Sequence, residues 1–394
     1  MHLAQPLPSR LRAPVVDFLR GWALFGVAIG NFLSFYYLGA DPERAKDTLT
    51  VALELIARYV FAAKSWTLLS ILFGYGFSVL IAHIADTGKP MSFFVKRMAW
   101  LLAFALLNTL FFWGDILRDY ALLGVLLLLL RNSSAKSLLR TSVLLILVVP
   151  FVAAYTRPFG AGLQAQADAL IPAFQSRDWL DVFRFNLETN WLMAILNPSY
   201  AIVVHMVMLA CMLLGMAAHR SDFIERLAAD ARLLKRLFLA SLALAIVLNA
   251  ALWHLGQVKA PFLTYFRFGY WGVISTMFAI ATGLCWLHGR GRMRALTVRL
   301  QDTGRMTLTN YMIQCVLLAV VFSGAGLGIF NTRPYWFYLA LAIGVYALQV
   351  VASRWWLARF QYGPMEWLWR KLSYGEAISS TANPRQPAPE GIRR

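Results

Sequence analysis

Long apolar runs alternate with short polar segments along most of the chain, which is typical of a helical membrane protein. Most runs approach the roughly 20 residues that a helix needs to cross a bilayer, and we count about ten. They lie at 18–38, 66–85, 97–113, 116–130, 138–155, 199–218, 237–254, 268–287, 307–328 and 335–352. The pattern predicts an all-α fold, a polytopic transmembrane helical bundle formed by one transmembrane domain over residues 1–375.

The first apolar run carries three polar residues on one helical stripe. Asp17 and Arg20 lie three residues apart and share a face near the start of the segment 14–37. Asn31 follows Arg20 by eleven residues, roughly three turns and a rise of about 16 Å, so it lies nearly above Arg20 on that stripe. Polar residues in membrane helices face protein or a water-filled cavity. The stripe predicts an internal functional site or, alternatively, an ion pair with an asparagine that packs against another helix.

A second polar group is predicted at the outer membrane edge. Asp115, Arg118 and Asp119 lie beside aromatic residues in the segment FWGDILRDYALLG. One interpretation is that Asp115 and Arg118 bind substrate at the mouth of an outward-facing cavity. The other is a charged hinge that is held by a local ion pair.

A third polar group repeats at helical spacing in the segment GRMTLTNYMIQ. Thr307, Asn310 and Gln314 follow one another by three and four residues and so form one stripe. This stripe is a candidate substrate-binding wall that faces Asp17 and Arg20. Hydrogen bonding between helices is the alternative, since such bonds are common between membrane helices.

Two histidines are candidates for acid–base chemistry. His205 and His254 fall in the outer halves of predicted spans, whereas His83, His219 and His288 lie at the inner ends of spans. A neutral imidazole can accept a proton near pH 7, because its unperturbed pKa is about 6.5. The alternative is that both are packing residues.

Composition and charge narrow the class of protein. Hydrophobic residues make up 59% of the chain and charged residues only 14%, whereas soluble domains carry about 25% charge. The net charge is +18, and the excess of lysine and arginine over acidic residues alternates from loop to loop. This alternation predicts that both termini are cytoplasmic. The basic segments, richest at 220–236 and 290–305, predict contact with anionic lipids of the inner leaflet rather than with nucleic acid.

Three further features of the sequence lead to predictions. The three cysteines lack metal-ligand spacing, so we predict neither a metal site nor a disulfide. Residues 178–191, inside the long outer loop 151–198, predict a surface helix. Residues 376–394 are polar and rich in proline, which predicts a disordered cytoplasmic tail.

No P-loop, dinucleotide-binding fingerprint, HExxH or GxSxG motif is present in the sequence. Five segments nevertheless resemble, in order from about residue 12 to 375, the motifs of the YeiB-like bacterial membrane proteins, a family with a domain of unknown function. They read VVDFLRGWALFGVAIGN, SWTLLSILFGYGFSVL, GDILRDYALLGVLLLL, GRMTLTNYMIQ and FQYGPMEWLWR. The resemblance implies a multi-pass protein of the bacterial inner membrane.

The first helix is also similar to that of the type-three membrane acyltransferases and of the heparan glucosaminide acetyltransferases. Asp17, Arg20 and Gly21 match their pattern, but Asn31 stands where the type-three family has a catalytic histidine. An asparagine amide cannot act as a general base, although it can donate to an oxyanion. The resemblance implies transfer of an acyl group from a cytoplasmic thioester, with acyl-CoA as donor, to an envelope glycan or lipid.

On that interpretation the first helix supplies most of the catalytic set. Arg20 would hold a phosphate or the thioester carbonyl, Asp17 would fix Arg20, and Asn31 would orient the acceptor. His205 or His254 would then take the acceptor's proton. The alternative function is transport of a small molecule or lipid through the same polar cavity.

Overall fold

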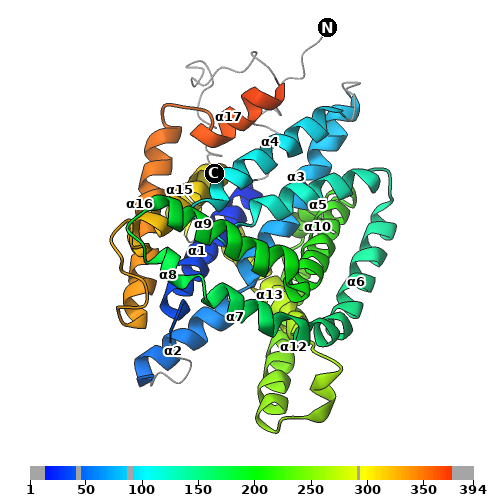
Figure 1. Ribbon diagram of the computed structural model, residues 1–394. Coiled ribbons are helices and arrows are strands. Elements are labelled where there is room, and N and C mark those ends of the chain that lie inside the picture. The colour runs from blue at the N-terminus through cyan, green and yellow to red at the C-terminus, as the bar shows by residue number, and fades with distance from the viewer. Residues whose placement is uncertain (1–13, 41–45, 87–91, 291–292, 375–394) are drawn as a thin grey trace.

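The computed structural model describes residues 14–40, 46–86, 92–290 and 293–374. These residues form helices joined by turns, so the predicted all-α fold is confirmed (Figure 1). The predicted tail at 376–394 lies outside the described residues. The helices are α1 (Pro14–Tyr37), α2 (Thr48–Ile56), η2 (Ala57–Phe61), α3 (Lys64–Asp86), α4 (Ser92–Thr109), α5 (Leu117–Leu129), α6 (Ala135–Thr156), η3 (Arg157–Gly160), α7 (Ala161–Asp168), α8 (Ile171–Phe174), α9 (Trp179–Asn190), η4 (Trp191–Leu196), η5 (Ser199–Val204), α10 (His205–Arg220), α11 (Phe223–Ala229), α12 (Ala231–Gln257), η6 (Pro261–Thr264), α13 (Gly269–Gly289), α14 (Arg294–Arg305), α15 (Thr307–Phe322), α16 (Tyr335–Leu357) and α17 (Pro364–Tyr374).

Seven helical segments of the described chain are long and apolar enough to cross a membrane, which makes this a multi-pass membrane protein. An eighth span results if α14 and α15 are counted together. The count of ten is therefore not confirmed. The segments are Pro14–Tyr37, Thr48–His83, Ala135–Gly160, Ser199–Arg220, Ala231–Gln257, Gly269–Gly289 and Tyr335–Leu357.

The difference in count comes from three short helices inside the bundle. α5 has 13 residues and begins with buried charges, α15 has 16 residues, and α4 has 18 residues with a lysine and an arginine in its first half. α15 also meets α14 at a bend of 79°. Apolar composition alone predicted spans here, but a helix needs about 20 residues to cross the hydrocarbon core unaided.

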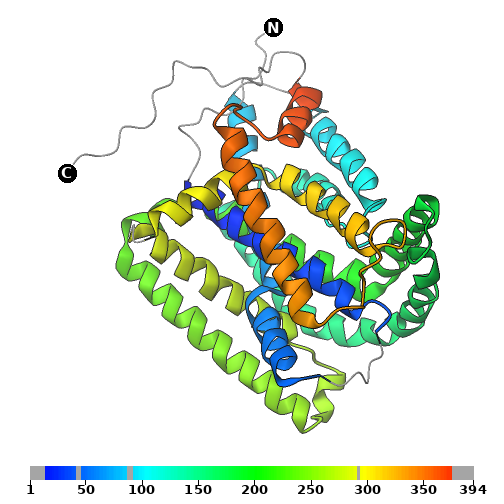
Figure 2. The same cartoon turned by 90° about the vertical axis from the view of Figure 1, so that its left-hand side faces the viewer.

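α1 runs through the middle of the bundle and is largely buried (Figure 2). It packs against α3, α14, α15 and α16. Two glycines allow α1 and α14 to approach closely. A Cβ atom at Gly21 would lie 2.1 Å from the Leu300 carbonyl oxygen, and one at Gly304 would lie 1.9 Å from the Asp17 carbonyl oxygen. Small residues allow such backbone contact between membrane helices. The crossing of α1 and α14 therefore fixes where Asp17 and Arg20 lie.

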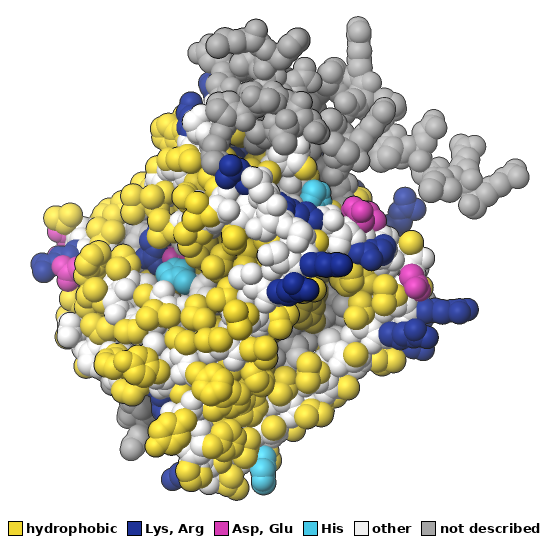
Figure 3. Space-filling model, turned by 90° about the vertical axis from the view of Figure 1, so that its right-hand side faces the viewer, with side chains coloured by type: hydrophobic (Ala, Val, Ile, Leu, Met, Phe, Trp, Pro, Cys, Tyr) yellow, Lys and Arg dark blue, Asp and Glu magenta, His cyan; other side chains and the backbone are white. Residues whose placement is uncertain are grey.

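The outer helices present apolar side chains on the surface. Leu144 and Leu147 of α6, Ile246 and Val247 of α12, and Leu348 of α16 are all exposed. Figure 3 shows one face that is mostly hydrophobic, with lysine and arginine gathered on its upper part. This distribution is that of a surface which faces lipid, since large apolar patches are rare on soluble monomers.

The predicted helix in the outer loop is present as α9, but it is not a plain surface helix. Val182, Phe185 and Asn186 are buried, whereas Arg184 and Glu188 are exposed. The Asn186 side chain donates to the Leu110 carbonyl oxygen at 2.9 Å. One face of α9 therefore joins the core and closes the turn between α4 and α5.

Candidate functional site

A cavity lies near the end of the bundle at which α1 begins, and we call it the basal cavity. Its volume is about 340 Å³. Its charged lining comprises Asp17, Arg20, Arg97, Arg305, Glu366 and Arg370. Its apolar lining includes Leu24, Leu69, Phe73, Leu101, Leu117 and Tyr120. Four arginines and a deep apolar wall in one cavity suit a ligand with an anionic head and an apolar chain.

The predicted pair at the start of α1 is present. Arg20 Nη1 donates to Asp17 Oδ1 at 3.0 Å, and Arg20 Nη2 donates to the Leu72 carbonyl oxygen at 3.4 Å. Asp17 is buried and Arg20 is half-buried. Thr307, at the start of α15, lines the same cavity. Three of the predicted site residues therefore share one space.

The C-terminal helix α17 forms part of the cavity wall and binds the start of α15. Glu366 Oε1 accepts from the backbone N–H groups of Leu308 at 2.7 Å and Thr309 at 3.1 Å. The Thr309 hydroxyl donates to Glu366 Oε2 at 2.5 Å. The side chain thus caps a helix that begins inside the protein, where its first N–H groups have no helical partners.

α17 is also joined to α4. Trp369 Nε1 donates to the Arg97 carbonyl oxygen at 2.8 Å, and the Arg97 guanidinium lies 3.7 Å from the centre of the Trp369 ring. Both side chains line the basal cavity. Part of the cavity wall is therefore formed by α17, the last described helix, where it packs against α4.

A second, smaller cavity lies further along α1 and holds Asn31. Its volume is about 70 Å³, and its lining includes Gly30, Asn31 and Ser65. The Asn31 side-chain nitrogen is buried and makes no hydrogen bond within the described part of the chain. Asn31 therefore lines a different cavity from Arg20.

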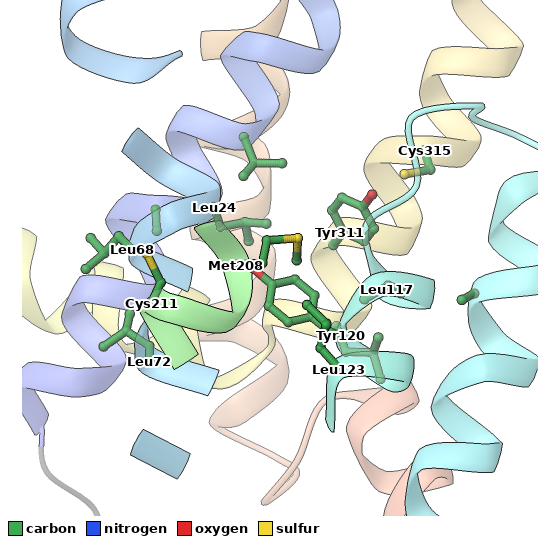
Figure 4. Close-up of a cluster of buried hydrophobic side chains, with 14 of the residues drawn as sticks. Leu24, Leu68, Leu72, Leu117, Tyr120, Leu123, Met208, Cys211, Tyr311 and Cys315 are labelled. Carbon is green, nitrogen blue, oxygen red and sulfur yellow. The ribbon is translucent and has the colours of Figure 1, made fainter. Parts of the chain in front are cut away.

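Ile116 and Tyr311 line both cavities and separate them. The Ile116 backbone N–H donates to the Tyr311 hydroxyl at 3.2 Å. Figure 4 shows Leu24, Leu117, Tyr120 and Tyr311 in one buried cluster of side chains from α1, α5 and α15. We call Ile116 and Tyr311 the septum.

The stripe on α15 divides between two roles. Asn310 Nδ2 donates to Ser353 Oγ at 2.9 Å, and Gln314 Nε2 donates to Gln349 Oε1 at 2.8 Å. Both partners belong to α16. Of the predicted stripe, only Thr307 faces the basal cavity, and the other two residues join α15 to α16, as the packing alternative predicted.

The residues at the start of α5 form a second polar region, which we call the buried charge cluster. Arg118 Nε and Nη2 donate to Asp119 Oδ1 at 2.9 and 2.6 Å, and Arg118 Nη1 donates to Asn190 Oδ1 at 2.5 Å. His205 Nε2 lies 3.1 Å from Asp119 Oδ1. The Tyr200 hydroxyl donates to Asp119 Oδ2 at 2.8 Å. Both carboxylate oxygens of Asp119 therefore have partners within the protein.

Asp115 lies beside this cluster and has its own partners. Asn108 Nδ2 donates to Asp115 Oδ1 at 2.7 Å, and the Arg118 backbone N–H lies 3.3 Å from Asp115 Oδ2. The structure thus brings Asp115, Arg118 and His205 together. It leaves His254 exposed on α12, a helix that packs chiefly against α13.

Several residues of these sites were not predicted from the sequence. Arg97 lies within α4 and Arg370 within α17, and neither was singled out, whereas Arg305, the last residue of α14, belongs to a segment that was predicted to contact anionic lipids. Asn190 belongs to the predicted loop helix, and its position four residues after Asn186 was the available signal. Among the described residues, no group of three His, Cys, Asp or Glu side chains could hold a metal ion.

The fold and the cavities define a multi-pass helical membrane protein with an arginine-lined cavity. Comparison with known proteins places it among proteins of unknown function. Residues 218–376 match the family described as "Protein of unknown function (DUF418)". No solved structure matches the chain.

Two relatives are similar along nearly the whole chain. The uncharacterized protein YxaH of Bacillus subtilis is 29% identical over 95% of this chain and 97% of its own length. The uncharacterized protein YeiB of Escherichia coli is 27% identical over 94% of this chain and 99% of its own. These matches confirm the predicted resemblance to the YeiB-like proteins. The resemblance to acyltransferases stays a prediction.

Proposed function

We propose that this protein binds an acyl-CoA-type amphiphile in the basal cavity, as the donor in acyl transfer at the bacterial inner membrane. The observation that carries the proposal is the joining of four arginines to an apolar wall in one cavity of about 340 Å³. Guanidinium groups bind phosphates through charge-assisted hydrogen bonds. The apolar wall would bury the acyl chain, and each buried methylene contributes about 0.8 kcal/mol.

The charge pattern supports a cytoplasmic mouth for this cavity. Arg97, Arg305 and Arg370 line the cavity near the start of α1, and basic residues favour the cytoplasmic side of membrane proteins. With the N-terminus inside, the cavity faces the compartment that contains acyl-CoA. Anionic lipids of the inner leaflet would meet the same basic end.

The chemistry of transfer has one supporting observation, the unpaired Asn31 amide, which can donate to an oxyanion. His205 Nε2 faces Asp119 and its Nδ1 lies 2.7 Å from the Ala201 carbonyl oxygen, so both ring nitrogens face acceptors, and His205 is in the described lining of neither cavity. In such a step the acceptor oxygen forms a bond to the acyl carbon while the carbon–sulfur bond breaks. The proton of the acceptor passes to a base and then to the leaving thiolate; for His205 to be that base, its Nδ1 must first release the Ala201 carbonyl oxygen.

Transport of the same amphiphile is the second candidate. It is favoured by two cavities that adjoin along α1 and are divided only by the septum. In the described lining, both carboxylates are already engaged, Asp17 by Arg20 and Glu366 by α15. A transporter needs no base in its cavity, whereas a transferase does.

Binding of acyl-CoA to purified protein in detergent tests the proposal. Wild-type protein should bind palmitoyl-CoA more tightly than free CoA and more tightly than an uncharged detergent. Arg20→Ala should weaken binding about tenfold or more, since charge-assisted contacts contribute about 1.5–3 kcal/mol. Arg184→Ala on the exposed face of α9 is the matched control and should bind normally.

Release of free CoA separates the two candidates. Thiol appearing in step with an acylated acceptor supports transfer. Uptake of intact acyl-CoA-type ligand into protein-containing vesicles, without thiol release, supports transport. Failure of the wild-type protein to bind any anionic amphiphile would overturn the proposed function.

A further inference from the structure

The septum stands at a defined distance along α1 from the arginines. Asp17, Arg20 and Leu24 line the basal cavity, whereas Gly30 and Asn31 line the smaller cavity beyond the septum. A helix rises 1.5 Å per residue, so Leu24 lies about 6 Å and Gly30 about 15 Å along the axis from Arg20. A chain that enters beside Arg20 therefore meets the septum before it reaches Asn31.

Contacts from two helices hold the septum in place. Tyr311 is buried on α15, and its hydroxyl accepts a hydrogen bond from the Ile116 N–H at the start of α5. Tyr311 and Ile116 each line both cavities. Close-packed interiors resist displacement of a large ring by a ligand, because the neighbouring side chains must move with it.

We infer that Tyr311 and Ile116 limit the length of the single apolar chain that the basal cavity accepts on an anionic head. The inference rests on the proposed function, because it takes that cavity as the site of the chain. Within the limit, each added methylene finds apolar contacts. Beyond this limit, added methylenes meet the septum and add no binding free energy.

The smaller cavity would become available if the septum were removed. Its volume of about 70 Å³ adjoins the basal cavity at these two side chains. A Cβ atom added at Gly30 would meet no other atom within 4 Å, so a larger residue at Gly30 can occupy the extra space. The chain thus offers both a way to extend the cavity and a way to fill the extension again.

A series of acyl-CoA ligands measures the limit directly. Dissociation constants are determined for saturated chains that differ by two methylenes, with full-length protein in detergent. For the wild type we expect affinity to rise about fourfold per methylene up to a limit and then to stay level or fall. The same series of lysophosphatidic acids distinguishes a lipid head group from CoA as the source of the anion.

Four variants test the septum. Tyr311→Ala and Ile116→Ala should each move the limit to longer chains by about two methylenes or more, since each opens the boundary with the smaller cavity. Tyr311→Phe should leave the limit unchanged, because it keeps the ring and loses only the hydroxyl. Tyr311→Ala combined with Gly30→Leu should restore the original limit.

The outcomes separate the two claims. Ligand binding with the same chain-length limit in wild type, Tyr311→Ala and Ile116→Ala would overturn the inference and leave the proposed function standing. Absence of binding in the wild type would overturn both. If Tyr311→Ala does not fold, Ile116→Ala still decides the matter, since the smaller change opens the same boundary.

Discussion

The basal cavity and the buried charge cluster both contain an arginine beside an aspartate, but they differ in how fully the arginine is occupied. The Arg20 side chain is 31% exposed, and its hydrogen bonds go to Asp17 and to one carbonyl group. The Arg118 side chain is 8% exposed, and its Nε, Nη1 and Nη2 all donate to Asp119 or Asn190. An arginine with remaining donor capacity at a cavity suits ligand binding. An arginine whose three nitrogens all donate within the protein suits positioning of its neighbours.

The largest expected effect comes from breaking the buried charge cluster. Arg118→Ala leaves Asp119 buried without its guanidinium partner, which should destabilise the protein by about 3–5 kcal/mol. Thermal unfolding in detergent measures the loss. Arg184→Ala removes an exposed ion pair with Glu188 and should change stability by about 0–1 kcal/mol. Equal losses in the two variants would contradict the distinction between the regions.

An intermediate effect is expected from the cap of α15. Glu366→Ala removes the acceptor for the N–H groups of Leu308 and Thr309 and should cost about 0.5–2 kcal/mol. Glu366→Gln keeps one acceptor oxygen and should lose less. Ser134→Ala, which removes the exposed cap of α6, is the comparison variant for a cap outside the site. A loss for Ser134→Ala larger than for Glu366→Ala would argue against the buried cap.

Arg20→Ala sharpens the comparison by separating binding from stability. The Arg20 side chain is 31% exposed and its partner Asp17 lines a cavity, so Arg20→Ala should destabilise the protein less than Arg118→Ala does. Ligand binding, in contrast, should fall strongly. Paired measurements of unfolding and of acyl-CoA binding check this split. A variant that loses stability in proportion to binding would assign Arg20 the same structural role as Arg118.

The smallest effect concerns the exposed cap of α12, outside both regions. Hydrogen bonds from the backbone N–H groups of Leu233 and Arg232 hold the pKa of Asp230 below its ordinary value of 3.8. Its contribution to stability is therefore complete above pH 3.8 and is lost as pH falls through the lower folded pKa. Asp230→Asn should show a weaker loss of thermal stability in this acidic window than the wild type.

The sequence predicted the bundle well because lipid-facing helices are recognisable from their length and composition. It predicted the contact of Arg20 with Asp17, because a separation of three residues in a helix places the two side chains on one face. It could not predict that Asn31 lies in a separate cavity, because that depends on Tyr311, which is distant in sequence. It could not place His205 beside Asp119 either, since periodicity along one helix says nothing about its neighbours.

The bend between α14 and α15 has a consequence for the order in which the protein can be completed during synthesis. The N–H groups that the bend leaves open are bound by Glu366, near the end of the described chain, and the Tyr346 hydroxyl donates to the carbonyl oxygen of Gly21 at 2.5 Å. The first helix made is thus joined to one of the last. A chain that stops before Pro364, where α17 begins, lacks the Glu366 cap of α15 and one wall of the basal cavity.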